Sequence, residues 1–142
     1  MRLQDIMKES VETVAPGDAA DAAFERMRQK RIRHLVVLEG RAVTGILSQR
    51  DIAKAEERRG RAVADLMSTP AVTAEPRTTV RQAANLLRGR TLGCLPVVAE
   101  GKLLGIVTTT DLLELLGHGA DHPVRRSGRR LERGSLRRLR AQ

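Results

Sequence analysis

The sequence repeats itself after 60 residues, and no gap is needed to align the two copies. Residues 5–7 (Asp-Ile-Met) align with residues 65–67 (Asp-Leu-Met), and Pro16 aligns with Pro76. Each copy closes in the pattern Gly-apolar-x-Ser/Thr-x-x-Asp, at residues 45–51 and 105–111. A fixed period of this length indicates two copies of one supersecondary unit. We therefore expect two halves packed about a pseudo-twofold axis, with a groove between them that suits a ligand.

Each copy predicts the order strand, helix, two strands, helix. In the first copy we expect an extended segment at 11–15, a helix from a cap at Asp18 to about Lys30, strands at 33–38 and 43–47, and a helix from Gln49 to about Arg59 capped by Ser48. In the second we expect an extended segment at 69–74, a helix from Thr78 or Thr79 to about Arg88, strands at 94–98 and 103–107, and a helix from Thr108 to Gly117. The charged link 56–64 is expected to run over the surface. The predicted class is α/β (α+β): two repeats, 1–60 and 61–117, packed through their sheets, with a tail at 118–142.

Composition narrows the class of protein. Phe24 is the only aromatic residue, which argues against folds that stack nucleic-acid bases on aromatic side chains. Cys94, the only cysteine, excludes an intramolecular disulfide, fits a reducing compartment and is expected in the core. No apolar stretch approaches 18 residues and no signal-peptide core is visible, so we expect a cytoplasmic protein without a membrane span.

The net charge of +9 is concentrated at the C-terminal end. Residues 121–142 carry eight arginines against Asp121 and Glu132. Three interpretations stay open for this tail: a solvated disordered extension, a contact with nucleic acid or an acidic partner, or a helix that stabilises a dimer.

The tandem unit resembles the CBS domain, named after cystathionine β-synthase, and the pair resembles a Bateman module. The resemblance rests on the two motifs at equal spacing, covers about residues 1–117, and extends to small stand-alone bacterial CBS-pair proteins through residues 31–37. It implies a non-enzymatic regulatory or energy-sensing module that binds AMP, ADP, ATP or S-adenosylmethionine in clefts between the repeats. It also implies no required cofactor, a homodimer of pairs, and a separate, unknown target protein.

The resemblance also implies the ligand-binding residues. Asp51 and Asp111 would hold the ribose hydroxyls, and Ser48 and Thr108 would lie near the phosphate. Residues that would surround the base or supply cations are Thr13, Val14, Ile32, Arg33, His34, Val36 and Arg50 in the first repeat, and Thr73, Ala74, Leu92, Cys94 and Pro96 in the second.

Elementary chemistry agrees with this assignment. A strand that ends at a helix N-terminus presents free N–H groups to an anion, and a Ser or Thr there adds a hydroxyl donor. The alternative is that Ser48 and Thr108 are simple N-caps and that Asp51 and Asp111 only complement the helix dipole. The two roles are compatible, and we favour a ligand role for at least one motif.

The two sites are expected to be unequal. Arg33, His34 and Arg50 of the first copy correspond to Gly93, Cys94 and Thr110 of the second. Basic groups for the second site would have to come across the pseudo-twofold axis or from a partner chain. Otherwise that site takes a less charged adenosyl ligand or stays empty.

The sequence shows no catalytic set and no metal-ligand spacing among its three histidines, so we expect neither an enzyme nor a metal site. A rival hypothesis is a protein that binds nucleic acid or an acidic partner through its arginine-rich tail, with the CBS pair as a dimeric scaffold. A second rival is a purely structural dimer with degenerate sites.

Overall fold

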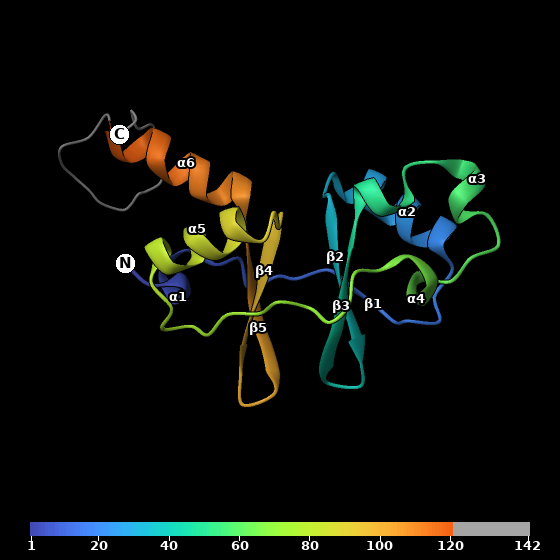
Figure 1. Ribbon diagram of the computed structural model, residues 1–142, viewed down its shortest axis with the longest axis horizontal. Helices are drawn as coiled ribbons and strands as arrows, with labels where there is room; N and C mark the ends of the chain where they lie inside the picture. The colour runs from blue at the N-terminus through green and yellow to red at the C-terminus, as the bar shows by residue number, and fades with distance from the viewer. Residues whose placement is uncertain (121–142) are drawn as a thin grey trace.

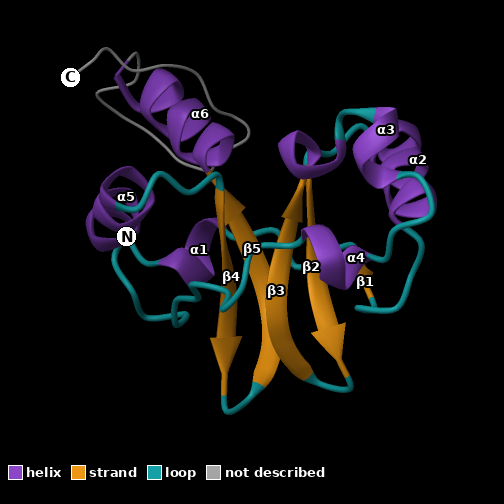
Figure 2. Cartoon of the chain, turned by 45° about the vertical axis from the view of Figure 1, so that its right-hand side comes forward, coloured by secondary structure: helices purple, strands orange, loops and turns teal. Residues whose placement is uncertain are grey.

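The computed structural model describes residues 1–120. Two β-hairpins stand next to one another in the middle of the molecule, and helices flank them on both outer sides (Figures 1 and 2). The elements of the first half are α1 (Leu3–Ile6), β1 (Thr13–Val14), α2 (Ala20–Lys30), β2 (His34–Glu39), β3 (Ala42–Ser48), the 3₁₀ turn η1 (Gln49–Ile52) and α3 (Ala55–Arg58). Those of the second half are α4 (Val63–Leu66), α5 (Val80–Gly89), β4 (Cys94–Ala99), β5 (Lys102–Thr108) and α6 (Thr109–Ala120).

The repeat in sequence is a repeat in structure. Strands β4 and β5 begin and end 60 positions after β2 and β3, and α4 lies 60 positions after α1. Strand β1 runs parallel to β2, which pairs antiparallel with β3, and β4 pairs antiparallel with β5. In the second half the counterpart of β1 is a single parallel bridge between Ala74 and Val97. The predicted hairpins and their order are confirmed.

Strand β2 is apolar on both faces because both faces are covered. Successive side chains of a strand point to opposite sides. Leu35 and Val37 pack against α2, whereas Val36 between them packs with Cys94 and Ile106 of the other half. The helices therefore cover the outer face of each sheet, and the two inner faces meet. The predicted packing of the repeats through their sheets is confirmed.

Each half is completed by a segment from the other. Leu3 of α1 is buried in the core of the second half, and Val63 of α4 is buried in the core of the first. In Figure 1 the blue helix α1 accordingly lies beside α5, and the green helix α4 lies beside α2. The expectation that the whole link 56–64 runs over the surface is wrong at Val63, because this side chain fills the core beneath α2.

Two short backbone bridges fix this crossing. Lys8 and Ile106 exchange hydrogen bonds of 3.0 and 2.9 Å, and Ser68 and Ile46 exchange bonds of 2.8 and 3.0 Å. The glycine that opens each motif makes room for the bridge. A Cβ at Gly105 would lie 2.8 Å from the carbonyl oxygen of Lys8 and 2.7 Å from Met7 Sδ, and Gly45 meets Ser68 and Met67 at the same distances. Glycine is required here because another backbone approaches closely.

Replacing Gly105 with alanine should therefore weaken the crossing. We expect Gly105→Ala to lower the free energy of unfolding by about 1–3 kcal/mol, because the added methyl forces a packed backbone to move. Gly89→Ala is the matched control: nothing lies within 4 Å of its Cβ position, and alanine favours a helix. Urea unfolding of both variants measures the difference, and equal effects would contradict this account.

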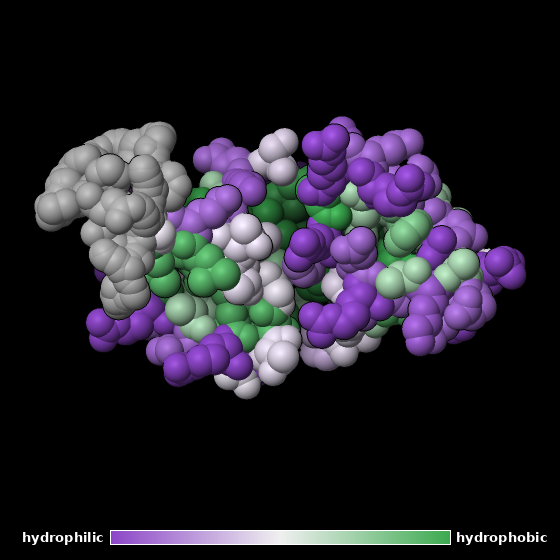
Figure 3. Space-filling view, turned by 90° about the horizontal axis from the view of Figure 1, so that it is seen from above, coloured by the Kyte–Doolittle hydropathy of each residue, from purple (hydrophilic) through white to green (hydrophobic). Residues whose placement is uncertain are grey.

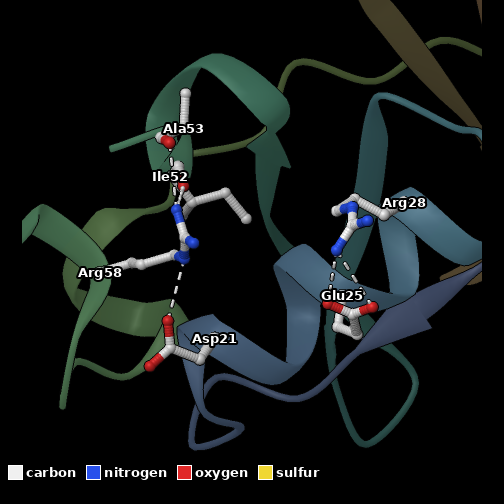
Figure 4. A network of polar contacts seen from close by, with 6 residues as sticks. All are labelled: Asp21, Glu25, Arg28, Ile52, Ala53 and Arg58. Carbon is white, nitrogen blue, oxygen red and sulfur yellow. Dashed lines mark hydrogen bonds and ion pairs between the residues drawn. The ribbon is translucent and has the colours of Figure 1, made fainter. Parts of the chain in front are cut away.

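The second helix of the first half is broken, contrary to expectation. The sequence predicts a helix from Gln49 to about Arg59, but η1 ends at Ile52 and Lys54 has an extended conformation before α3. The Arg58 side chain stabilises this break. Its guanidinium donates hydrogen bonds of 3.0 Å to the carbonyl oxygens of both Ile52 and Ala53, which satisfies groups that a continuous helix would bond internally (Figure 4).

Arg58 also ties this turn to α2. Its Nε lies 2.9 Å from Asp21 Oδ1, and its guanidinium carbon lies 3.8 Å from the centre of the Phe24 ring. The neighbouring Glu25–Arg28 pair in Figure 4 is exposed at both ends, and such pairs contribute little to stability. Arg58 therefore links η1 and α3 to helix α2.

We expect Arg58→Ala to lower the free energy of unfolding by about 1–3 kcal/mol, since it removes charge-assisted hydrogen bonds and a cation–π contact from a side chain that is 15% exposed. The control is Arg59→Ala, at the exposed position next to it. Denaturant titration of the two variants should show a loss for Arg58→Ala alone.

Three helix ends test the predicted caps. Asp18 does not cap α2: Ala19 is the N-cap, and the Asp18 carboxylate instead accepts a hydrogen bond from the backbone of Ala15, which closes the preceding turn. Thr79 caps α5 in a reciprocal pair with Gln82, as one of the two predicted alternatives. Helix α6 does not end at Gly117 but continues to Ala120.

Candidate functional site

A cleft of about 1300 Å³ opens between the two halves, at the ends of β3 and β5. Figure 3 looks onto this side of the molecule and shows a hollow with an apolar floor and polar walls. Both Ser/Thr-x-x-Asp motifs reach it, because each motif lies where a hairpin ends and the next helical turn begins. Residues of both motifs therefore border the same cleft.

The motif residues cap these helical turns in the same way. The Asp51 carboxylate accepts a hydrogen bond of 2.9 Å from the Ser48 backbone through Oδ2, and the Ser48 hydroxyl accepts one of 3.3 Å from the Asp51 backbone. Thr108 and Asp111 repeat the arrangement at 2.9 and 3.1 Å. Each aspartate commits one oxygen to its cap, which leaves Oδ1 for another partner. Capping and ligand binding are thus compatible in this geometry.

Some of the predicted site residues line the cleft and others do not. Those on its walls are Ile32, Arg33, His34, Ser48, Arg50, Leu92, Thr108 and Asp111. Those away from its walls are Thr13, Val14, Val36, Asp51, Thr73, Ala74, Cys94 and Pro96. Among the second group, Val14, Val36, Ala74, Cys94 and Pro96 are buried in the packed cores.

The cleft also contains residues that sequence reasoning did not identify. The segment Lys8–Glu12 crosses it on the way from α1 to β1, and Ala84, Leu87 and Arg88 of α5 form part of one wall. Leu113 and Leu116 of α6 add apolar surface that is 63% and 54% exposed. The only sequence signal for Lys8 is its place in the repeat, where the other copy has the neutral Ser68.

The charge of the lining is predominantly positive. Its cations are Lys8, Arg31, Arg33, Arg50 and Arg88, and its carboxylates are Glu12, Asp111 and Glu114. A cleft lined mainly by one sign of charge concentrates ligands of the opposite sign. All of these cations except Arg88 come from the first half, so the two walls differ in charge.

His34 lies at the seam between the halves. A Cβ at Gly93 would collide with its Nε2, so the glycine that stands in place of the first repeat's Arg33 makes room for the imidazole. Burial lowers the pKa of His34, Asp51 opposes this effect, and Arg33 and Arg50 add to it. Burial likewise raises the pKa of the Cys94 thiol to about 12, consistent with the expected core position.

The lowered pKa of His34 predicts a loss of stability in mild acid. Because the folded state binds this proton less readily than the unfolded state, the free energy of unfolding should fall as the pH drops through 6.5 towards the lower, folded-state pKa. Comparing wild type with His34→Gln in urea at about pH 7.5 and 5.5 isolates this group. We expect the variant to lose less stability between the two pH values, and parallel losses would contradict the assignment.

The model of the CBS domain family matches the chain twice, at residues 3–58 and 63–118. The chain belongs to the CBS-domain family. The CBS domain-containing protein YhcV of Bacillus subtilis is 32% identical over 114 residues, which cover 78% of this chain and 81% of YhcV. The two matches confirm the tandem CBS pair expected from the repeat.

Other relatives carry a similar pair within a longer protein or have a known structure. Inosine-5'-monophosphate dehydrogenase of Korarchaeum cryptofilum is 33% identical over 118 residues, but the chain spans only 25% of its length. The crystal structure of CBSX2 in complex with AMP superimposes with a TM-score of 0.72 at 27% identity, over 80% of this chain and 94% of that one. The CBS pair therefore occurs both alone and as one part of an enzyme.

No helix within residues 1–120 is long and apolar enough to span a bilayer. The same part of the chain holds no group of three or more His, Cys, Asp or Glu side chains placed to bind a metal ion. The arginine-rich residues 121–142 of the predicted tail, to which its three alternative roles were assigned, lie outside the described part.

Proposed function

We propose that this CBS pair is a non-enzymatic regulatory module that binds an adenine nucleotide or adenosyl ligand in the cleft between its repeats. The observation that carries the proposal is the cleft itself. Its lining joins two capped helical N-termini, Ser48 and Thr108, to a surplus of lysine and arginine side chains. Such an arrangement suits a ligand that has an anionic group for the cations and helix N-termini, a base for the apolar surface, and hydroxyl groups for the carboxylate of the motif.

The comparison with CBSX2 supports the same class of ligand. That protein binds AMP, and its fold extends over most of this chain. The cationic lining here favours phosphorylated ligands such as AMP, ADP and ATP over S-adenosylmethionine, whose sulfonium is positively charged. We therefore rank the nucleotides above the adenosyl sulfonium.

Regulation would follow from the shared cleft. A ligand that touches both walls stabilises one arrangement of the repeats over others, and only such differential affinity can shift a conformational equilibrium. The change would then pass to a separate target protein, with a homodimer of pairs as the proposed assembly. The rival role of the tail in binding nucleic acid gains no support from the comparisons.

Thermal unfolding in the presence of AMP, ADP, ATP, S-adenosylmethionine and NAD tests the proposal. A ligand at 100 times its Kd should stabilise the folded state by about 2.7 kcal/mol, which raises Tm by several degrees for a chain of this size. We expect a shift with at least one adenine nucleotide. No shift with any ligand would reject the proposal in favour of a structural scaffold.

Matched variants show whether the shift comes from this cleft. Asp111→Asn and Arg50→Ala alter its lining and should reduce the shift, each measured against its own ligand-free Tm. Arg41→Ala is the control, because Arg41 is exposed in the β2–β3 turn outside the lining and should leave the shift intact. Equal shifts in all variants would place the ligand elsewhere.

A further inference from the structure

Lys8 brings a positive charge from the first repeat to the motif of the second. Its Nζ lies 3.2 Å from Asp111 Oδ1, the oxygen that Asp111 does not use for its cap. The Lys8 side chain is 67% exposed in the cleft, whereas that of Asp111 is 8% exposed. The backbone of Lys8 is anchored by its bridge to Ile106, which fixes the point from which the side chain reaches this carboxylate.

The same carboxylate creates an electrostatic problem for an anionic ligand. The N-terminus of α6 attracts an anion through its free N–H groups, but the negative Asp111 in its first turn repels one. An ammonium beside Asp111 neutralises this repulsion and offers donors of its own to a phosphate. Lys8 thus makes the N-terminus of α6 usable by a phosphorylated ligand.

In the first repeat, cationic side chains of the same repeat can offset the charge of the motif aspartate. Arg50 lies within its motif and Arg33 lines the same cleft, but their counterparts in the second repeat are Gly93 and Thr110, which carry no charge. Lys8 in turn corresponds to the neutral Ser68. The cation missing from the second repeat is therefore supplied across the pseudo-twofold axis by a residue with no charged counterpart.

We propose that Lys8 is a specificity-determining residue that makes the second motif select nucleoside phosphates over uncharged nucleosides and sulfonium ligands. The inference rests on the proposed function of the cleft. When ribose hydroxyls bind Asp111 and displace the Lys8 ammonium, the phosphate of the same ligand gives the ammonium a new favourable contact. A neutral nucleoside displaces it without compensation, and a sulfonium meets it with like charge.

Isothermal titration of the full chain with ADP, adenosine and S-adenosylmethionine tests this selection. Lys8→Ser gives the second motif the residue that the repeat has at Ser68. We expect it to weaken ADP binding about five- to ten-fold while adenosine binding is unchanged or tighter, so the ratio of the two affinities falls by at least that factor. Binding of S-adenosylmethionine should tighten.

Two further variants separate specificity from general structure. Lys8→Arg keeps the positive charge and should retain most of the wild-type preference for ADP. Lys102→Ser removes an exposed lysine outside the cleft lining and should leave the ratio unchanged. The Tm of each ligand-free variant confirms that it is folded.

Distinct results would overturn the two proposals. If wild type binds ADP and the ratio stays within two-fold in Lys8→Ser, Lys8 does not select phosphates, although the cleft still binds nucleotide. The same conclusion follows if wild type binds adenosine as tightly as ADP. If no ligand binds wild type, the proposed function fails and the inference fails with it.

Discussion

The backbone bridges between the repeats are the constraint on which the rest of this structure depends. Lys8 pairs with Ile106, and Ser68 pairs with Ile46, so each repeat extends the hairpin of the other. The bridges are possible because Gly45 and Gly105 carry no side chain where the crossing backbone passes. They join two small halves, neither of which has a complete core alone, since Leu3 and Val63 each fill the core of the opposite half. The cleft exists because the two hairpins are held side by side in this way.

The capping bonds of the two motif aspartates use one carboxylate oxygen each and leave the other for a second partner. Each aspartate uses Oδ2 for the backbone at its own N-cap. The second oxygen of Asp111 faces Lys8, and Asp51 instead interacts electrostatically with His34. A polar pattern that reads as a simple helix cap can therefore also be a binding site, because capping occupies only half of the carboxylate. This division explains why sequence reasoning alone left the two interpretations of the motif open.

Charge breaks the symmetry that the fold maintains. The two hairpins pair in the same register, but Arg33 and Arg50 of the first repeat are replaced by the uncharged Gly93 and Thr110 in the second. His34 and Gly93 show that such differences are coupled, because the ring of one occupies the space that a side chain at the other would need. The lysine of the crossing segment then restores a cation beside Asp111 from the opposite repeat. The two repeats thus share one fold, but the cleft walls that they form differ in charge.

The sequence by itself determined what is local or periodic. The 60-residue repeat, the two hairpins, the caps at Ser48, Thr79 and Thr108, and the family were all readable from it, because turns, caps and alternation depend on neighbours in the chain. Only the tertiary structure decided which copy each segment completes, since a periodic sequence is equally consistent with packing within a repeat or between repeats. The same holds for the break between η1 and α3, where Arg58 bonds the free carbonyl groups, and for the pairing of Lys8 with Asp111, 103 positions away. These contacts depend on distances between elements that no local pattern encodes.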